Sequence, residues 1–368
     1  MEKQNNIKEV NYIKGIAILL VFIGHAATPS FLVRPYIYEF IVQLIYSMHM
    51  PLFFLVSGFL AYKITSMNLN KDYLSFLKNK FYRLGIPFLI ISFITNAIII
   101  VFKQLFAGPI SVEVVIDMIK TIFLYPENGV MGALWFLYTL FIISIISPII
   151  VKLPLKLLIV VSLIFNIFTP KDISFLAINR ISFFLVYFLI GIYFRKYYED
   201  NKSNIFKNIS TFKRIFILII ASICNFSYAY IIANQISMQK YVIDILSFIC
   251  GISGMVIVLM VIKKIKNTKI CNVLSCLGKY SIDIYIFSWF FQVASMLLIT
   301  KILKINNYTI FFISNIIIGS LCLPFSIYIL RRFKIFKFLF LGEWESSDTS
   351  KDSYDLNILE SLDDETDE

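Results

Sequence analysis

The stretch YIKGIAILLVFIGHAAT, residues 12–28, decides the fold of this chain. It carries one lysine near its start and one histidine near its end, and its other residues are mostly apolar. A helix of about 17–25 such residues can cross the hydrocarbon core of a membrane, which is about 30 Å thick. Similar runs follow at 41–62, 84–102, 132–151, 155–170, 181–194, 214–233, 241–262, 279–300 and 308–330. The sequence therefore predicts an all-α, polytopic integral membrane bundle of about ten transmembrane helices.

The composition agrees with this interpretation. Hydrophobic residues make up 59% of the chain and charged residues 15%, whereas a soluble domain averages roughly 25% charged residues. So little charge cannot cover a surface exposed to water, so we expect membrane lipid as a partner. The net charge of +11 does not indicate nucleic acid, because the basic residues lie in short clusters between the apolar runs.

These basic clusters predict the orientation in the membrane. They follow the second, sixth, eighth and tenth runs, at residues 63–83, 195–214, 263–279 and 331–337. Basic loops stay on the cytoplasmic side, so we expect an even number of spans and both termini in the cytoplasm. The many Ile, Asn and Lys residues are typical of an AT-rich bacterial genome, so we expect a multi-pass protein of the bacterial plasma membrane.

The two ends of the chain need separate interpretations. Residues 343–368 are acidic and lack an apolar period, which predicts a disordered cytoplasmic tail after a membrane domain at 1–342. The first run has an alternative interpretation as a cleaved signal peptide. We favour a retained helix, because nine spans would place the basic end outside.

The five cysteines predict neither a zinc site nor a disulfide framework, and we expect no metal.

Ionisable residues at membrane depth are costly and often functional. The only two histidines, His25 and His49, end the first run and open the second, and histidine is the natural general base near neutral pH. For His25 we favour catalysis; for His49 an interfacial histidine is the alternative. Glu39 is either a carboxylate partner for His25 or a solvated loop acid. Asp283 is predicted to form a structural ion pair with Lys279, one turn away.

Lys14 and His25 are predicted to share one helix face. They are eleven residues apart, which at about 100° per residue is three turns plus about 20°. Their side chains then point the same way, about 16 Å apart along the axis. A cation on the inner half and a base on the outer half would face one groove. The alternative for Lys14 is an ordinary flanking lysine.

Five short motifs carry a resemblance. They are Lys14–His25, HMPLFFLVSGF at 49–59, KFYRLGIP at 80–87, LWFL at 134–137 and LGKYSIDIY at 277–285. In this order they resemble the membrane acyltransferase 3 family, whose first helix carries an arginine, ten residues and then a histidine. The Lys-Gly start is most similar to the stand-alone branch with fucose O-acetylases and polysaccharide-adhesin proteins.

The resemblance implies transfer of an acyl group, usually acetyl, from cytoplasmic acetyl-CoA to a hydroxyl of a surface glycan, beside glycan-synthesis partners. His25 would be the essential base and Lys14 would replace the arginine. The phosphates of the acyl-CoA would lie near Lys14, Lys80 and Arg83. Ser57 or Trp135 would donate to the forming oxyanion, although Ser57-Gly58 also reads as a helix-packing pair.

This chain departs from the family pattern in three ways. Lysine in place of arginine loses the bidentate fork that suits phosphate. Ser288 stands where the family often has a histidine, and no extracellular hydrolase-like domain follows the last span. Two other functions remain open: an exporter of polysaccharide or lipid-linked sugar without chemistry, and a sensor that relays through its acidic tail.

Overall fold

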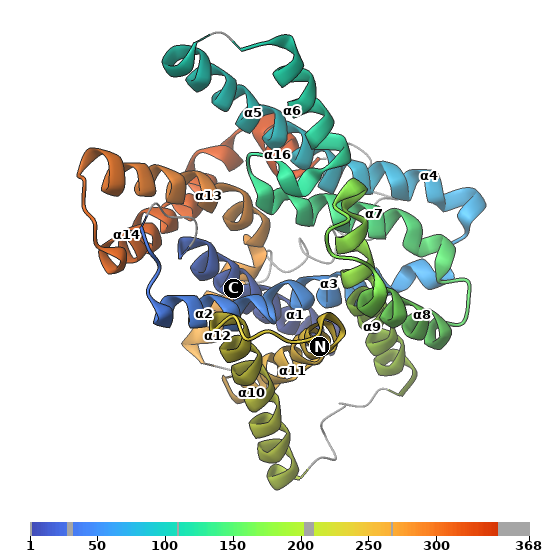
Figure 1. The fold of residues 1–368 in the computed structure, drawn as a ribbon. Coiled ribbons are helices and arrows are strands. Elements are labelled where there is room, and N and C mark those ends of the chain that lie inside the picture. Colours follow the sequence, from blue (N-terminus) through green and yellow to red (C-terminus); the bar gives the residue numbers. More distant parts are fainter. Residues whose placement is uncertain (1, 28–31, 109, 202–209, 266–267, 345–368) are drawn as a thin grey trace, which may run out of the picture.

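The fold is all-helical, as the sequence predicts. A computed structural model describes residues 2–27, 32–108, 110–201, 210–265 and 268–344, and within these ranges every regular element is a helix (Figure 1). The predicted disordered tail lies almost entirely outside the described residues, since only Glu343 and Trp344 belong to them.

Within the described ranges there are sixteen α-helices, with short 3-10 and π-helical segments between some of them. They are α1 (Glu2–Ala26), α2 (Tyr36–Tyr46), α3 (His49–Leu60), α4 (Leu69–Lys80), α5 (Ile86–Ala107), α6 (Val112–Leu124), α7 (Trp135–Ile150), α8 (Leu155–Phe168), α9 (Ile178–Asn201), α10 (Thr211–Ala233), α11 (Lys240–Ile265), α12 (Lys269–Lys279), α13 (Ser281–Leu297), α14 (Tyr308–Ser320), α15 (Cys322–Tyr328) and α16 (Lys334–Leu341).

Nine helical segments of the described chain are long and apolar enough to cross a membrane. They correspond to nine of the ten predicted runs. The remaining run, 155–170, forms the shorter apolar helix α8. Its 14 residues extend about 21 Å at 1.5 Å per residue, which is less than the hydrocarbon thickness. The described residues therefore contain nine segments long enough to span a membrane and one shorter apolar helix, α8.

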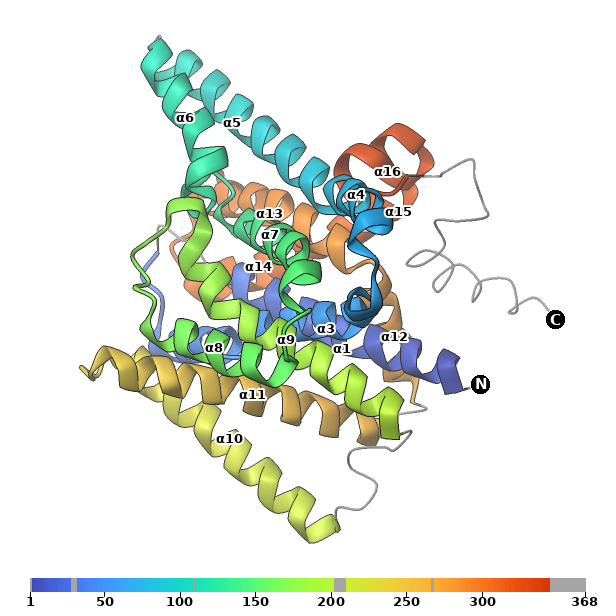
Figure 2. The ribbon, with the colours of Figure 1, turned by 90° about the vertical axis from the view of Figure 1, so that its right-hand side faces the viewer.

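Both described ends of the chain lie at the same end of the bundle (Figure 2). The start of α1 packs on α12, because a Cβ at Gly278 would lie 2.0 Å from the carbonyl oxygen of Asn11. Arg331, near the other end, is bonded to Asp283 at the start of α13. Two ends on one side require an even number of crossings, so the nine long segments need a tenth, and α8 is the one further apolar helix that the described chain offers for it. That this side is cytoplasmic remains the prediction from the basic loops.

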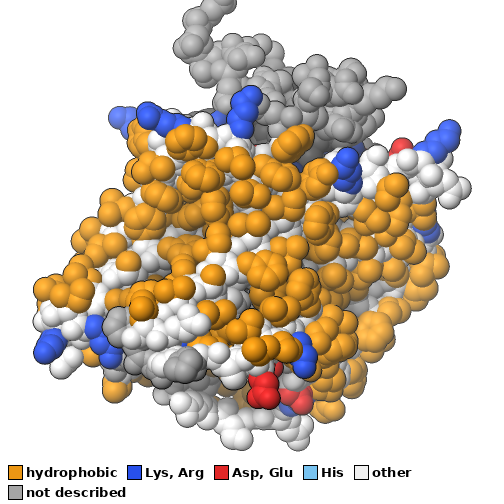
Figure 3. All heavy atoms as spheres, turned by 90° about the horizontal axis from the view of Figure 1, so that it is seen from above, with side chains coloured by type: hydrophobic (Ala, Val, Ile, Leu, Met, Phe, Trp, Pro, Cys, Tyr) orange, Lys and Arg blue, Asp and Glu red, His pale blue; other side chains and the backbone are white. Residues whose placement is uncertain are grey.

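The surface is dominated by apolar side chains. Figure 3 shows one face covered by hydrophobic residues, with the lysines and arginines near its edges. Exposed residues of this kind include Phe93, Val101, Phe102 and Ile116 of α5 and α6. A continuous apolar surface bordered by charges is what a lipid-facing bundle requires.

Helix α1 lies in the centre of the bundle. It contacts α2, α3, α11, α12, α13 and α14 (Figure 1). The contacts are close where glycine removes the side chain: a Cβ at Gly15 would lie 2.1 Å from the carbonyl oxygen of Leu274 in α12. Small residues allow membrane helices to approach in this way. The first run is therefore an integral helix of the fold, which argues against the signal-peptide alternative.

The second span is broken into α2 and α3. The break lies at Ser47 and Met48, four residues before Pro51, whose ring has no N–H and would clash with the Ser47 carbonyl in a continuous helix. The Ser47 hydroxyl lies 2.9 Å from Oδ1 of Asn225 in α10. The Asn225 amide in turn donates to the Ser253 hydroxyl of α11, at 2.6 Å. The predicted run 41–62 is therefore one span but not one uninterrupted helix.

Candidate active site

The last turns of α1, which carry His25, are held by side chains from two other helices. Gln292 of α13 donates its amide Nε2 to the Phe22 carbonyl, at 3.1 Å. Asn315 of α14 donates its Nδ2 to the Ala26 carbonyl, at 2.9 Å. The hydroxyl of Tyr308 donates to the carbonyl of the next residue, Ala27. Asn315 and Tyr308 thus satisfy carbonyls at the end of α1, which have no partner within the helix. Gln292 adds a bond to a carbonyl one turn earlier.

The structure brings the two predicted histidines to one aromatic ring. The ring centroid of Tyr46 lies 6.4 Å from that of His25 and 5.1 Å from that of His49. Gly24 makes room for this arrangement, because a Cβ there would lie 2.9 Å from Cε1 of Tyr46. Tyr46 was not among the predicted site residues, although it lies between the two histidines in the sequence.

The two histidines differ in their surroundings. His49 is 6% exposed, and its Nδ1 lies 2.8 Å from the Ile45 carbonyl oxygen. Since a carbonyl only accepts, Nδ1 carries the proton and Nε2 of the neutral ring keeps its lone pair. His25 is only partly buried. His25 is therefore the more exposed of the two imidazoles, and His49 is held by the end of α2.

Glu39 is held by groups of its own neighbourhood. One carboxylate oxygen accepts from Nη1 of Arg34 and the other from Nε2 of Gln43, each at 2.6 Å. Both oxygens are thus already bonded near the start of α2. The role of Glu39 as the carboxylate partner of His25 stays a prediction. In the alternative interpretation, Glu39 is a loop acid whose ion-pair partner is Arg34.

The two candidate oxyanion donors lie in different settings. The Trp135 ring stacks on Phe184 with centroids 5.3 Å apart, and the Arg180 guanidinium lies over it at 4.7 Å. Ser57 is on α3, about two turns beyond His49, in a partly buried position. Beside it, a Cβ at Gly58 would lie 1.9 Å from the Phe188 carbonyl oxygen. Gly58 thus allows α3 and α9 to pack closely, which agrees with the interpretation of Ser57-Gly58 as a helix-packing pair.

At the inner end, Arg83 lies in an irregular part of the third span. Residues Phe81–Gly85 form a π-helical turn between α4 and α5, in which the Ile86 N–H bonds to the Phe81 carbonyl. Pro87 has no N–H to offer the Arg83 carbonyl, which favours this wider turn. Arg83 is exposed. The segment after α16 packs against this turn, because a Cβ at Gly342 would lie 2.5 Å from Cα of Arg83.

The other two predicted cations also lie toward the inner end. Lys14 is partly buried, on a helix that is continuous up to His25. Helical geometry therefore puts both side chains on one side of α1, while their opening into one groove stays a prediction. Lys80 ends α4, with its Nζ 5.3 Å from the centroid of the Phe76 ring.

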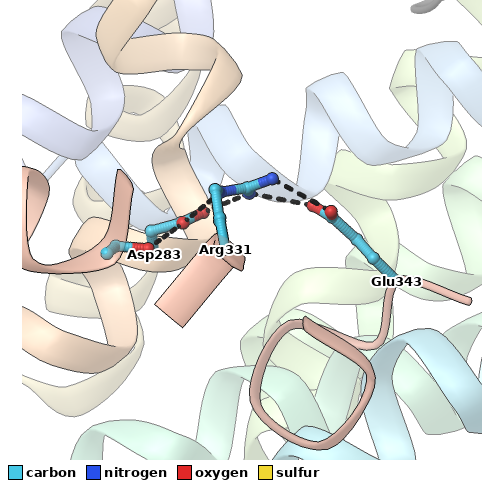
Figure 4. A network of polar contacts seen from close by, with 4 residues as sticks. Asp283, Arg331 and Glu343 are labelled. Atoms are coloured by element: carbon cyan, nitrogen blue, oxygen red, sulfur yellow. Dashed lines mark hydrogen bonds and ion pairs between the residues drawn. The ribbon is translucent and has the colours of Figure 1, made fainter. Parts of the chain in front are cut away.

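Near these cations, Asp283, Arg331 and Glu343 form a charged network (Figure 4). Arg331 donates to both oxygens of Asp283, at 2.8 and 2.9 Å, and to both oxygens of Glu343, at 2.9 Å each. The Ser326 hydroxyl also donates to Asp283, which is 0% exposed. The predicted structural ion pair of Asp283 therefore exists, but its bidentate partner is Arg331 rather than Lys279, the residue expected from helical spacing.

A comparison with known protein families identifies the family of this chain. A family model described as an acyltransferase domain matches residues 7–331. The chain belongs to the acyltransferase 3 family. It is therefore a multi-pass membrane acyltransferase, and the match spans both histidines, Lys14 and the basic third span. No curated protein and no solved structure gave a match.

Proposed function

We propose that this acyltransferase moves an acetyl group from cytoplasmic acetyl-CoA to a hydroxyl of a cell-surface polysaccharide or glycan. One observation supports it most: in a chain of this family, the central helix carries a partly exposed imidazole at its outer end and a lysine at its inner end. Its motifs are most similar to the fucose O-acetylase and polysaccharide-adhesin branch. We place the protein in the bacterial plasma membrane, because the reaction has to join cytoplasmic acetyl-CoA to a glycan outside the cell.

His25 acts as the general base in the proposed reaction. Its imidazole takes the proton of the acceptor hydroxyl while that oxygen attacks the thioester carbonyl. The new C–O bond forms as the C–S bond breaks, and the coenzyme A thiolate leaves with the proton that the imidazolium returns. The products are the acetylated sugar and free coenzyme A, so neither metal nor redox partner is consumed.

The donor is held from the cytoplasmic side. Lys14, Lys80 and Arg83 bind its phosphates in the proposal, because cations at the inner end suit a polyanionic nucleotide. Lysine serves here as a point charge, without the fork of an arginine. The pantetheine arm then bridges the distance of about 16 Å from Lys14 to His25 along α1.

The break in the second span adds donors for the oxyanion. Ser57 and Trp135 remain the side chains proposed for this role. The backbone N–H groups of His49 and Met50 are the first donors of α3, and the start of a helix carries a partial positive charge. These groups lie beside Tyr46 and suit the stabilisation of a tetrahedral oxyanion.

Replacement of His25 by alanine tests the proposal against the exporter alternative. We expect the acetyl content of the surface glycan to fall by about 10²–10⁴-fold, the usual contribution of a general base, while the amount of surface glycan stays the same. Mass analysis of the glycan and an antibody against it measure the two quantities. Loss of the glycan itself from the surface would favour the exporter, and unchanged acetylation would refute a catalytic His25.

A further inference from the structure

We propose that Gln292 and Asn315 are positioning residues that hold the turn of α1 carrying His25 in its reactive orientation. This inference rests on the proposed function of His25. Their donors contact the carbonyls of Phe22 and Ala26, which are four residues apart and therefore stacked along one side of α1. His25 lies between these two attachment points.

The hydrogen bonding of the two amides supports this role. The amide nitrogens are used, whereas Oε1 of Gln292 and Oδ1 of Asn315 are buried without a hydrogen-bond partner among the described residues. A buried polar group without a partner is destabilising, and an apolar side chain at either position would avoid that cost. The fold keeps two amides whose contribution is the donor directed at α1. An unsatisfied buried group calls for an explanation, and at these two positions the bond to the turn of α1 around His25 provides it.

The packing around Gln292 serves the same contact. Gly319 of α14 faces it, and a Cβ there would lie 2.9 Å from Cγ of Gln292 and 3.0 Å from Cε2 of Phe22. The absence of a side chain at Gly319 thus lets the glutamine reach α1. Gln292 and Asn315 are 4% and 1% exposed, so neither is positioned by water at the surface.

A simple capping role is the competing explanation, and the chain contains a matched control for it. Asn166 of α8 donates its Nδ2 to the Phe183 carbonyl of α9, at 2.7 Å. Its Oδ1 is likewise buried without a partner in the described structure. Asn166 therefore repeats the chemistry of Asn315, between two helices that carry neither histidine. A purely structural amide should behave alike at both positions.

The kinetic experiment compares Gln292→Leu, Asn315→Leu and Asn166→Leu in purified protein, with acetyl-CoA as donor. We expect kcat to fall about 10- to 100-fold in the first two variants, since small misplacements of a reacting group cost this much. The KM for acetyl-CoA should stay near the wild-type value, because the donor phosphates bind at the other end of α1. Asn166→Leu should lose stability but keep its kcat.

A second measurement does not depend on turnover. Diethyl pyrocarbonate acylates imidazole rings, and the chain has two histidines, so peptide mass analysis reports the ratio of modified His25 to His49. We expect this ratio to change in both positioning variants and to stay at the wild-type value in Asn166→Leu. Wild-type values of kcat and of the ratio in the positioning variants would overturn the inference, as would equal changes in Asn166→Leu. If the wild-type protein transfers no acetyl group, the proposed function fails and the modification ratio alone decides.

Discussion

Helix α13 carries two buried polar clusters that differ in kind. At its inner start, Asp283 is bonded on both oxygens by Arg331, so every charge has a partner. About 14 Å further along the axis, Gln292 leaves its amide oxygen unpaired while its nitrogen bonds to α1. In the inner cluster the charged groups bond to one another. In the outer cluster the one hydrogen bond of the Gln292 amide goes to α1, the helix that carries His25. We infer that the first cluster holds the bundle together and that the second supports the proposed site.

The largest expected effect is on the inner cluster. Arg331→Met leaves Asp283, which is 0% exposed, without its charge partner. Breaking a buried ion pair in this way destabilises by about 3–5 kcal/mol, so we expect a marked drop in the midpoint of unfolding in detergent micelles. The double variant Asp283→Asn with Arg331→Met should recover part of the loss, because no buried charge then remains.

Arg195 provides the control for this prediction. It pairs with Glu199 one turn away, and the Glu199 side chain is 46% exposed. Pairs of this kind contribute less than about 1 kcal/mol. Equal unfolding midpoints for Arg195→Met and Arg331→Met would show that the network in Figure 4 is not a stabilising element.

The next effect concerns the glycine at the inner end of α1. In Gly15→Ala the added Cβ would lie 2.1 Å from the Leu274 carbonyl oxygen, a backbone atom that cannot move alone. We expect α1 and α12 to be forced apart at a cost of about 1–3 kcal/mol, despite the higher helix propensity of alanine. Gly129→Ala is the control, since its Cβ would meet the Pro126 oxygen at an ordinary 3.5 Å. A thermal unfolding series that ranks the two variants equally would contradict the prediction.

The smallest effect on stability is expected at the outer glycine of the same helix. In Gly24→Ala the nearest atoms are the ends of the Tyr46 and Ile45 side chains, at 2.9 and 3.3 Å, which can shift. We expect a loss of about 1 kcal/mol or less, but a clear fall in acetyl transfer, because the Tyr46 ring contacts both histidines. Turnover and unfolding are measured on the same preparation. Intact turnover in Gly24→Ala would mean that the position of Tyr46 does not matter.

Most of the fold could be predicted because transmembrane helices depend on composition averaged over about 20 residues. The runs correspond to nine full-length spans and α8. The average did not show the break at Ser47, because that depends on a single missing N–H at Pro51. Nor did it show that α8, with 14 residues, is shorter than the other spans.

The candidate site could be predicted only as far as its contacts are local. Lys14 and His25 share a helix face because eleven helical residues fix their relation. The bonds from Gln292 and Asn315 to α1 join residues 270 and 289 positions apart, which no spacing in the sequence indicates. The sequence indicated these two bonds only by placing an amide side chain in each of two apolar runs, 279–300 and 308–330. Asp283 illustrates the same limit, since its partner lies 48 residues away rather than one turn away.

The bond between Asp283 and Arg331 also has a consequence for biosynthesis. A ribosome adds about 5–20 residues per second, so the aspartate waits roughly 2–10 seconds for the arginine that follows 48 residues later. During that interval α13 enters the membrane with an uncompensated carboxyl group, which insertion alone does not favour. The nascent chain therefore has to keep this helix near the translocon until the last span, which ends beside Arg331, has been made.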